Sequence, residues 1–528
     1  MSVRPILIDG EWTPSAAEET FRPANPAARQ PLDDEYPVSP RDEVERAIQA
    51  AADAFAATAG WPGERFAAFL DAYAARIDAR ADEIIELAHA ETALPVAPRL
   101  REVELPRTVN QLRQAASAAR EGSWSLPTID VKNNIRSLHA PIGPVAVFGP
   151  NNFPFAFNSI AGGDFAAAVA AGNPVIAKGH SLHPGTTRLF AEEAQAATEE
   201  TEMPAGFVQL LYRTSHEDGA LLVSHPLMGA AAYTGSRTGG LALKQAADRA
   251  GKPIYLELSS INPVFVLPGA VEERIQKLVD EFTASCLMGA GQFCTNPGLV
   301  VLLESPETDA FQMAVAARFD ATPPGTLLAE SVLEGLAESV ERWRAAGAKL
   351  VTGGKPVEGR LAYANTLLRI EADAWLKDPD ALQTEAFGNA TLFVIARDAE
   401  ELLEVANSLE GNLTGAIYSD TRGGDDALAA KVERVLRRKV GRLLNDKMPT
   451  GVAVSPAMNH GGPFPATGHP GFTAVGVPAS LRRFSALHCY DNVRPQRLPI
   501  PLRDPNSTGD TWRLIDGLWT REAVVKKP

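Results

Sequence analysis

The sequence predicts an α/β protein with two parallel β-sheets joined by helical crossovers. From residue 141 onward, short apolar runs end in turn residues and are followed by Ala-rich helical stretches, an alternation typical of parallel sheets. The 528 residues also exceed the roughly 250–300 at which one hydrophobic core stops growing. Residues 123–138 and the Pro-rich tail after residue 465 fit neither series. We therefore expect two α/β domains and separate extended elements that pair between subunits.

The N-terminal segment begins extended and then carries helix signals. Ser39 is placed to cap a helix, with Pro40 in the first turn and Asp42 three residues after the cap. Apolar side chains then recur at helical spacing, and further helical blocks cover about residues 64–93 and 102–120. We expect this segment to be largely helical.

Two series of strand signals follow. The first comprises residues 144–150, 174–179, 207–212, 230–236 and 253–258. The second comprises residues 262–267, 298–304, 390–396 and 415–419, with a helix over about residues 271–290. Each series predicts one α/β domain.

Composition narrows the function. The formal charge of −15 argues against nucleic-acid binding, which needs a basic face, and against adhesion to an anionic membrane. Three cysteines are too few for a disulfide framework, and no CxxC or HxxxH spacing suggests a metal site. No signal peptide is evident, and the longest apolar runs fall far short of the roughly 20 residues of a membrane helix. We expect a soluble, cytoplasmic protein that uses no metal.

Cys294 is the first candidate catalytic residue. It lies in the segment GQFCTNPG, residues 291–298, between a predicted helix and a predicted strand. The flanking glycines permit close approach of a substrate to the backbone, and a thiolate is a strong nucleophile when a neighbouring group stabilises it. The alternative is a buried structural cysteine, which is the usual state of a lone cysteine.

Glu257 lies at the end of a predicted strand and Asn152 follows another, at the edge where open α/β sheets bind ligands. A carboxylate beside such a crevice can act as a general base, and an Asn amide can donate to a developing oxyanion. The alternatives are a Glu257 that faces solvent on an edge strand and an Asn152 that belongs to an ordinary turn.

A glycine-rich turn follows the strand signal at residues 230–236. Gly235 and Ser236 precede Gly239, Gly240 and a helix, an arrangement suited to a phosphate at a helix N-terminus. The turn does not match the GxGxxG pattern, so by itself it is weak evidence for a dinucleotide.

In their order and spacing, five segments together resemble the aldehyde dehydrogenase superfamily over nearly the whole chain. They are NFP at 152–154, YTGS at 233–236, LEL at 256–258, GQFC at 291–294 and EAFG at 385–388. The family's last segment continues with Pro, where this chain has Asn389.

The resemblance implies the aldehyde dehydrogenase fold. A Rossmann-like NAD(P)-binding domain would cover residues 1–122 and 139–258, and an α/β catalytic domain residues 259–468. A small β oligomerisation domain would combine residues 123–138 with the tail at 469–528. A homodimer or homotetramer is implied, because such arms leave strand edges that must be paired.

The resemblance also implies a role for each residue and a small aldehyde as substrate. Cys294 would attack the aldehyde, Asn152 and the Cys294 N–H would hold the oxyanion of the thiohemiacetal, and Glu257 would activate water to hydrolyse the thioester. Contacts with the cofactor would come from six residues: Lys178 and Glu385 on the two riboses, Phe387 at the nicotinamide, and Gly235, Ser236 and Gly240 around the pyrophosphate.

Ser181 predicts a preference for NADP, with NAD also usable. Family members that prefer NAD carry Glu at this place in a KPxE run, whereas this chain has KGHS at 178–181. The exchange removes repulsion toward a 2′-phosphate, which Lys178 can then pair with. Arg213 is a second candidate partner; its alternative is a solvated loop arginine.

The segments KGHSLHPGT, GQFCTNPG and 451–467 resemble one subfamily of 2,5-dioxopentanoate (2-oxoglutarate semialdehyde) dehydrogenases and an NADP-dependent fatty aldehyde dehydrogenase. We expect 2,5-dioxopentanoate first, although the sequence assigns no residue to its carboxylate. Medium or long aliphatic aldehydes come second, with a tunnel lined by Phe155, Phe157, Phe293 and Phe464. A CoA-acylating enzyme and a non-catalytic scaffold are further alternatives, against which Glu257 and Cys294 argue.

Overall fold

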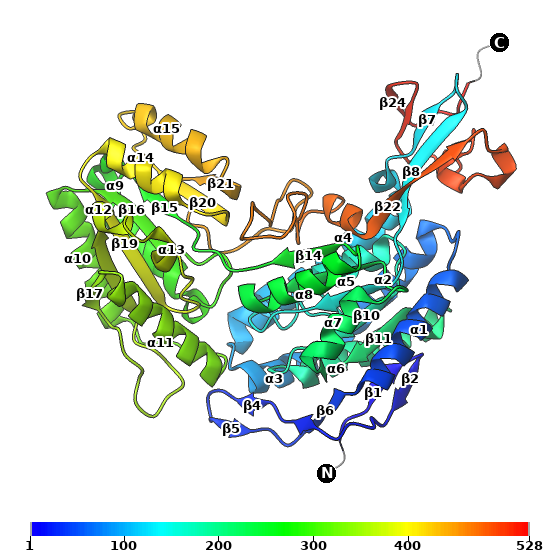
Figure 1. Cartoon of the computed structure of the whole chain (residues 1–528), viewed down its shortest axis with the longest axis horizontal. Helices are drawn as coiled ribbons and strands as arrows, with labels where there is room; N and C mark the ends of the chain where they lie inside the picture. Colours follow the sequence, from blue (N-terminus) through cyan, green and yellow to red (C-terminus); the bar gives the residue numbers. More distant parts are fainter. Residues whose placement is uncertain (1–2, 526–528) are drawn as a thin grey trace.

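The computed structural model describes residues 3–525 and has three parts (Figure 1). Two seven-stranded sheets, each flanked by helices, lie side by side, and a five-stranded sheet projects from the first of them as an arm. The α/β architecture expected from the sequence is confirmed. No helix within the described residues is both long and apolar enough to cross a membrane.

The first sheet has the strand order β14-β13-β9-β10-β11-β1-β2. Its strands are β1 (Ile6–Ile8), β2 (Glu11–Thr13), β9 (Val145–Phe148), β10 (Val175–Lys178), β11 (Val208–Leu211), β13 (Ala230–Thr234) and β14 (Ile254–Glu257). The strands from β14 to β11 are parallel, so their carboxyl ends meet at one edge. Along the chain, β10 and β11 are added on one side of β9 and β13 and β14 on the other. Ligands of open α/β sheets bind at such a switch point.

Helices pack on this sheet and form one large buried core with it. They are α1 (Arg41–Ala57), α2 (Gly63–Ala79), α3 (Ala81–Thr92), α4 (Leu105–Glu121), α5 (Gly163–Ala170), α6 (Pro184–Glu200), α7 (His216–Ser224) and α8 (Arg237–Arg249). The block predicted over 64–93 is thus two helices that meet at Arg80.

The predicted cap of α1 is wrong. Pro40 occupies the position before the helix, and the buried hydroxyl of Ser39 has no hydrogen-bond partner among residues 3–525. Ser39 instead ends strand β6 (Tyr36–Ser39), which pairs with β12 (Arg213–Thr214). This pairing holds Ser39 in a strand, so its side chain does not reach the first turn of the helix.

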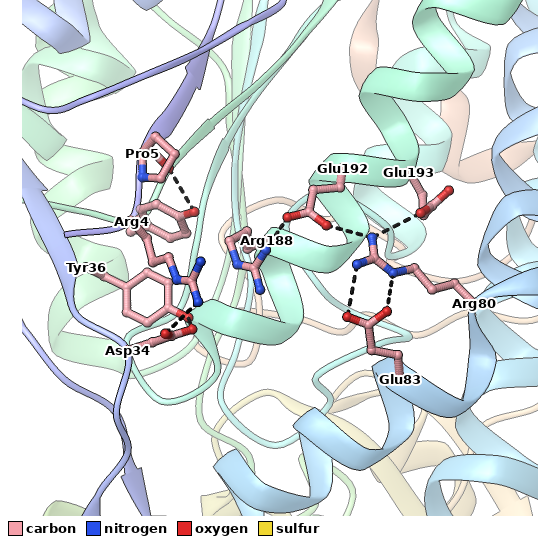
Figure 2. Close-up of polar contacts among 10 residues, drawn as sticks. Arg4, Pro5, Asp34, Tyr36, Arg80, Glu83, Arg188, Glu192 and Glu193 are labelled. Carbon is pink, nitrogen blue, oxygen red and sulfur yellow. Dashed lines mark hydrogen bonds and ion pairs between the residues drawn. The ribbon is translucent and has the colours of Figure 1, made fainter. Parts of the chain in front are cut away.

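Ion pairs fasten α6 to its surroundings (Figure 2). Arg80 contacts the carboxylates of Glu83, Glu192 and Glu193. At the start of α6, the buried Glu91 accepts hydrogen bonds from the main-chain N–H groups of Gly185 at 2.7 Å and Thr186 at 2.9 Å. These contacts fix the turn between β10 and α6, which lies beside the switch point.

The second sheet has the order β17-β18-β19-β16-β15-β20-β21 and is parallel except for β17. Its strands are β15 (Val264–Val266), β16 (Leu299–Leu303), β17 (Lys349–Thr352), β18 (Thr366–Glu371), β19 (Ala390–Ala396), β20 (Asn412–Tyr418) and β21 (Val440–Asn445). The helices around it are α9 (Pro268–Leu287), α10 (Pro306–Ala321), α11 (Glu330–Ala345), α12 (Ala372–Trp375), α13 (Pro379–Leu382), α14 (Ala399–Ser408) and α15 (Asp426–Leu436). Two buried clusters form its core.

The arm joins two distant segments of the chain in the order β22-β8-β7-β23-β24. Its strands are β7 (Thr128–Asp130), β8 (Ile135–Pro141), β22 (Ser485–Asp491), β23 (Arg513–Ile515) and β24 (Leu518–Thr520). A small apolar cluster of its own stabilises it. The domain limits given above stay a prediction.

Candidate active site

Asn152, Glu257 and Cys294 come together where the two sheets face each other. Asn152 follows β9, Glu257 is the last residue of β14, and Cys294 lies between the short helix η4 (Met288–Gly291) and β16. The Glu257 side chain is buried, with 1% of its surface exposed, so it does not face solvent although β14 is an edge strand. All three side chains therefore lie at or near the ends of helices or strands.

His460 joins Cys294 to Glu257. Its Nε2 atom lies 3.5 Å from Sγ of Cys294 and 3.0 Å from Oε1 of Glu257. The imidazole is buried against the ring of Phe157, at 5.8 Å between centroids, and its main-chain N–H donates to Oγ1 of Thr473. One ring nitrogen thus contacts both the predicted nucleophile and the predicted base, so the three groups can share a proton.

The cluster keeps the Cys294 thiol protonated at rest. Burial raises the pKa of Cys294 well above its ordinary value, and the carboxylates of Glu257 and Glu385 raise it further, while the charge of Arg107 opposes them. The thiol must therefore lose its proton as it attacks, which requires an adjacent base. The second carboxylate oxygen of Glu257, Oε2, is buried and has no hydrogen-bond partner among the described residues.

The amide of Asn152 is oriented toward the nucleophile. Its Nδ2 donates to the carbonyl of Gln292 at 3.0 Å, and the carbonyl of Asn152 accepts from Nη2 of Arg99 at 2.8 Å. An amide nitrogen carries two hydrogens. One is held by the segment just before Cys294, and the other is left to donate to an oxyanion.

The turn that carries Cys294 is held rigidly from two sides. Nδ2 of Asn262 donates to the carbonyls of Cys294 and Asn296, both at 2.9 Å. Gly291 adopts a φ of 70°, and a Cβ there would lie 2.1 Å from the carbonyl oxygen of Gly388. Only glycine fits such a position, so the GQFC segment has a backbone reason for its glycine.

A cavity of about 830 Å³ opens onto Cys294 and His460. Its walls are mostly apolar, and Phe157 and Phe293 are among the residues that line them. The other two phenylalanines predicted to line a tunnel lie elsewhere. Phe155 is fully buried and packs edge-on against Phe190 in the core, and Phe464 is 60% exposed, away from the cavity.

The glycine turn lies at the switch point of the first sheet. Oγ of Ser236 accepts from the N–H of Gly239 at 3.3 Å and caps α8, and the Ser236 side chain is exposed. The N–H of Gly235 donates to the carbonyl of Glu257 at 3.1 Å. Gly240 is buried, and a Cβ there would lie 2.4 Å from Leu258 Cδ2. An open helix N-terminus of this kind suits the pyrophosphate of a dinucleotide.

Lys178 and Ser181 lie in the neighbouring turn, after β10. Lys178 is the last residue of the strand, and burial lowers its pKa to about 8, with a further lowering by the charge of Arg213. The His180 and His183 rings stack at 5.3 Å, and burial lowers the pKa of both, that of His183 to about 4. Both imidazoles are therefore neutral at pH 7, and Lys178 carries the charge of the turn. Arg213 is exposed.

Glu385 and Phe387 lie across the crevice, in the segment before β19. Glu385 lines a second cavity of about 240 Å³ together with Ser259. Burial raises the pKa of Glu385 to about 7, while hydrogen bonds from Ser259 and the Ser260 backbone oppose the rise. Phe387 is half-buried. Arg237, the residue after Ser236, lines the same cavity as Glu385, and the set fits a dinucleotide; the individual cofactor roles stay proposals.

One group of residues in the described part of the chain has the spacing of metal ligands. The ligand atoms of Glu257, Cys294 and His460 lie within 4.8 Å of one another. Cys294 and Glu257 are also the predicted nucleophile and base, with His460 between them, so a metal ion would occupy the groups expected to move the proton. The expectation of a metal-free reaction stays a prediction.

Sequence reasoning missed His460 and two arginines. His460 lies in the segment 451–467, which resembles the subfamily, but the sequence pattern assigns no chemistry to it. Arg99 and Arg107 line the cavity beside Cys294, whereas in the sequence they sit among the charged residues of a helical block. The only available signal was His460-Gly461-Gly462, a histidine before two glycines.

Residues 12–455 match the sequence profile of the Aldehyde dehydrogenase family. The chain is 41% identical over 529 aligned positions to "Alpha-ketoglutaric semialdehyde dehydrogenase 2" of Azospirillum brasilense, covering 97% of this chain and 98% of the relative. It is 36% identical to "Alpha-ketoglutaric semialdehyde dehydrogenase" of Acinetobacter baylyi, covering 98% of each.

Solved structures share the fold. A structure of PnpE in complex with nicotinamide adenine dinucleotide superposes with a TM-score of 0.79 at 22% identity, covering 94% of this chain and 99% of that one. A mutant of Aldehyde Dehydrogenase C from Pseudomonas syringae, in complex with NAD+ and octanal, gives a TM-score of 0.78 at 20% identity, covering 94% and 98%. At these identities the likeness establishes the fold alone.

Proposed function

The chain belongs to the aldehyde dehydrogenase family, and on that premise we propose that it oxidises 2,5-dioxopentanoate to 2-oxoglutarate with NADP. The observation that carries the proposal is the contact chain from Sγ of Cys294 through Nε2 of His460 to Oε1 of Glu257, at the end of a cavity. In this proposal Cys294 is the nucleophile, Glu257 the base and Asn152 the oxyanion donor.

In the first step, Cys294 attacks the aldehyde carbon as it loses its proton. Nε2 of His460 is 3.5 Å from Sγ and receives that proton, and the imidazolium so formed is stabilised by Glu257 at 3.0 Å. The new thiohemiacetal oxygen carries the charge. The free N–H of the Asn152 amide and the N–H of Cys294 donate to it.

In the second step, the thiohemiacetal on Cys294 becomes a thioester and then a free acid. The nicotinamide, when bound, supplies the hydride acceptor. Glu257 takes a proton from water as the water attacks the thioester carbon, and Sγ of Cys294 leaves as the thiolate and takes back the proton held on His460. Glu257 then releases its proton to solvent. The buried Oε2 of Glu257, unpartnered among the described residues, is the oxygen open to that water.

The cofactor preference rests on Lys178 and Ser181. Ser181 places no negative charge beside the adenosine ribose, and Lys178 is a half-buried cation at the end of β10. A 2′-phosphate would form an ion pair with the Lys178 ammonium group and so offset the cost of its burial. Both features support NADP over NAD.

The names of the two relatives support 2,5-dioxopentanoate as the substrate, because alpha-ketoglutaric semialdehyde is the same compound. One observation favours a second candidate. The cavity is lined mainly by apolar side chains such as Phe157, Phe293 and Val452, which suits medium or long aliphatic aldehydes. The two candidates differ in whether the cavity must also bind a carboxylate.

An aldehyde panel assayed with NAD and NADP side by side tests the proposal. We expect kcat/KM with NADP to be at least roughly tenfold higher for 2,5-dioxopentanoate than for hexanal, since specificity is a ratio of these constants. A ratio below one would favour the aliphatic aldehyde, and a clear NAD preference would contradict the interpretation of Ser181. Formation of an acyl-CoA in the presence of CoA would show that water is not the acceptor.

We also propose that the arm pairs with a second copy to give a homodimer or homotetramer. β22 is the edge strand of the arm and exposes Leu487, and β24 exposes Leu518. Unpaired edges with apolar side chains need a partner. Light scattering on the purified protein measures the assembly directly.

The free state of Cys286, Cys294 and Cys489 suits a reducing, cytoplasmic compartment.

A further inference from the structure

The cavity beside Cys294 contains charged groups that the reaction itself does not use. Three charged side chains line it apart from the catalytic cluster: Arg99, Glu102 and Arg107. Glu102 is exposed, so its charge is largely solvated. The two arginines are half-buried among apolar rings, where a charge interacts more strongly than in water.

Arg99 already has partners that hold the Asn152 loop. Its Nε donates to Oε2 of Glu104 at 3.1 Å, and its Nη2 donates to the carbonyl of Asn152 at 2.8 Å. Its guanidinium also lies over the rings of Phe153 and Phe293, at 4.3 and 4.8 Å from their centroids. Arg99 thus has a structural explanation.

Arg107 has no comparable set of partners. Its Nε donates to Oε1 of Gln111 at 3.2 Å, one turn further along α4. Its Nη2 is buried and has no hydrogen-bond partner among the described residues. Burial lowers the pKa of Arg107 from its usual value, but a guanidinium remains charged in proteins. The cavity wall therefore contains a guanidinium with one buried nitrogen, Nη2, that finds no acceptor within residues 3–525.

The position of Arg107 relates it to the reacting atoms. Its guanidinium lies 5.3 Å from the ring centroid of Phe157, and the same ring lies 5.8 Å from the imidazole of His460. The charge of Arg107 also acts to lower the pKa of the Cys294 thiol. A short molecule with its aldehyde carbon at Cys294 therefore has its far end within reach of Arg107. A planar guanidinium binds a carboxylate there better than any neutral group.

We propose that Arg107 binds the carboxylate of a short aldehyde acid and selects such substrates over neutral aldehydes of the same length. The inference rests on the proposed function and supplies the carboxylate anchor that the sequence left unassigned. With Arg107 as the anchor, a cavity with mostly apolar walls can still bind an anionic substrate. The walls contact the carbon chain, and the guanidinium of Arg107 binds the carboxylate at its end.

The test compares 5-oxopentanoate with pentanal, which differ only in the carboxylate, in the wild type, Arg107→Met and Arg113→Met. Arg113 lies on the same helix, is exposed and pairs with Asp78, so its variant controls for loss of a positive charge on α4. We expect the kcat/KM ratio of acid to neutral aldehyde to fall roughly 10- to 100-fold in Arg107→Met, mainly through KM. The ratio should be unchanged in Arg113→Met.

Inhibition gives a second readout that does not depend on turnover of the acid. Glutarate should compete with pentanal in the wild type and in Arg113→Met, and this competition should be lost in Arg107→Met. If Arg107→Met does not fold, Arg107→Lys keeps the charge but loses the planar fork, and we expect it to show an intermediate ratio.

The outcomes separate the inference from the proposed function. A wild type that prefers 5-oxopentanoate, with the preference retained in Arg107→Met, would overturn the role of Arg107 and leave the proposed function standing. A wild type whose kcat/KM for pentanal equals or exceeds its kcat/KM for 2,5-dioxopentanoate would overturn both. An Arg107-dependent preference for 5-oxopentanoate with poor turnover of 2,5-dioxopentanoate would support the anchor and refute the proposed substrate.

Discussion

The cluster around Cys294 and the dinucleotide turns share one edge of the first sheet but are built differently. In the cluster, side chains contact side chains: Cys294, His460 and Glu257 form a chain of 3.5 and 3.0 Å contacts in a buried setting. At the turns, main-chain groups at strand and helix ends face an open crevice, and Ser236 is exposed. The proposed reacting groups are therefore positioned by contacts with one another, whereas the turns present main-chain groups at strand and helix ends.

This difference predicts that the two regions can be altered independently. Substitutions in the cluster should remove chemistry and leave cofactor affinity intact. Substitutions in the turns should change affinity and cofactor choice and leave the chemical step intact.

Replacement of the nucleophile should have the largest effect. Cys294→Ala should lower turnover by more than about 10⁴-fold, because no other group in the cluster can form the thiohemiacetal. NADPH binding, measured by fluorescence titration, should stay within about twofold of the wild type. Residual turnover above one part in a hundred would place the nucleophile elsewhere.

Removal of the base should stop the reaction after the first hydride transfer. In Glu257→Gln we expect a burst of NADPH close to one per active site, followed by a steady rate roughly 10²- to 10⁴-fold slower. Stopped-flow absorbance separates the two phases. The exposed Glu272→Gln on α9 is the matched control, and a Glu257→Gln enzyme without a burst would argue that Glu257 acts before hydride transfer.

The pH dependence of thiol alkylation tests the bridge through His460. Because the pKa of Cys294 is raised, the reactive thiolate fraction should keep growing with pH, and the rate with iodoacetamide should still rise at pH 9. In His460→Asn, kcat/KM should fall roughly 10²-fold. His488→Asn, at an exposed site on β22, should behave like the wild type. An alkylation rate that levels off below pH 8 would show that the thiol is already ionised.

The smallest effect should come from the cofactor turn. Ser181→Glu should lower the ratio of NADP to NAD kcat/KM by roughly 5- to 30-fold, equivalent to one or two kcal/mol of repulsion. In the wild type, NADP affinity should weaken as pH rises past the Lys178 pKa of about 8, because the cation is then lost, whereas NAD affinity should change less. Ser331→Glu, exposed on α11, is the control. A ratio unchanged in Ser181→Glu would contradict the assignment.

The same contrast explains what the sequence could predict. Asn152, Glu257 and Ser236 stand at or within four residues of strand ends, so a pattern of apolar runs and turns locates them without any tertiary information. His460 lies in a long segment outside any helix or strand, and its neighbours depend on how that segment folds back. Arg107 is one arginine among several on an amphipathic helix, and only the structure shows that it turns toward a cavity.

That returning segment has a consequence for the assembled enzyme. After His460 the chain crosses to the first sheet, where Thr467 bridges Glu257 and the N–H of Leu258 donates to the Ala466 carbonyl at 2.8 Å. It then continues into β22, the edge of the arm. The bridging imidazole and the edge strand that we propose as the subunit contact therefore belong to one continuous segment of the chain. Dilution that separates the proposed subunits would loosen the arm and, through the same segment, weaken the contacts that hold Glu257. Specific activity should therefore fall on dilution and recover on concentration.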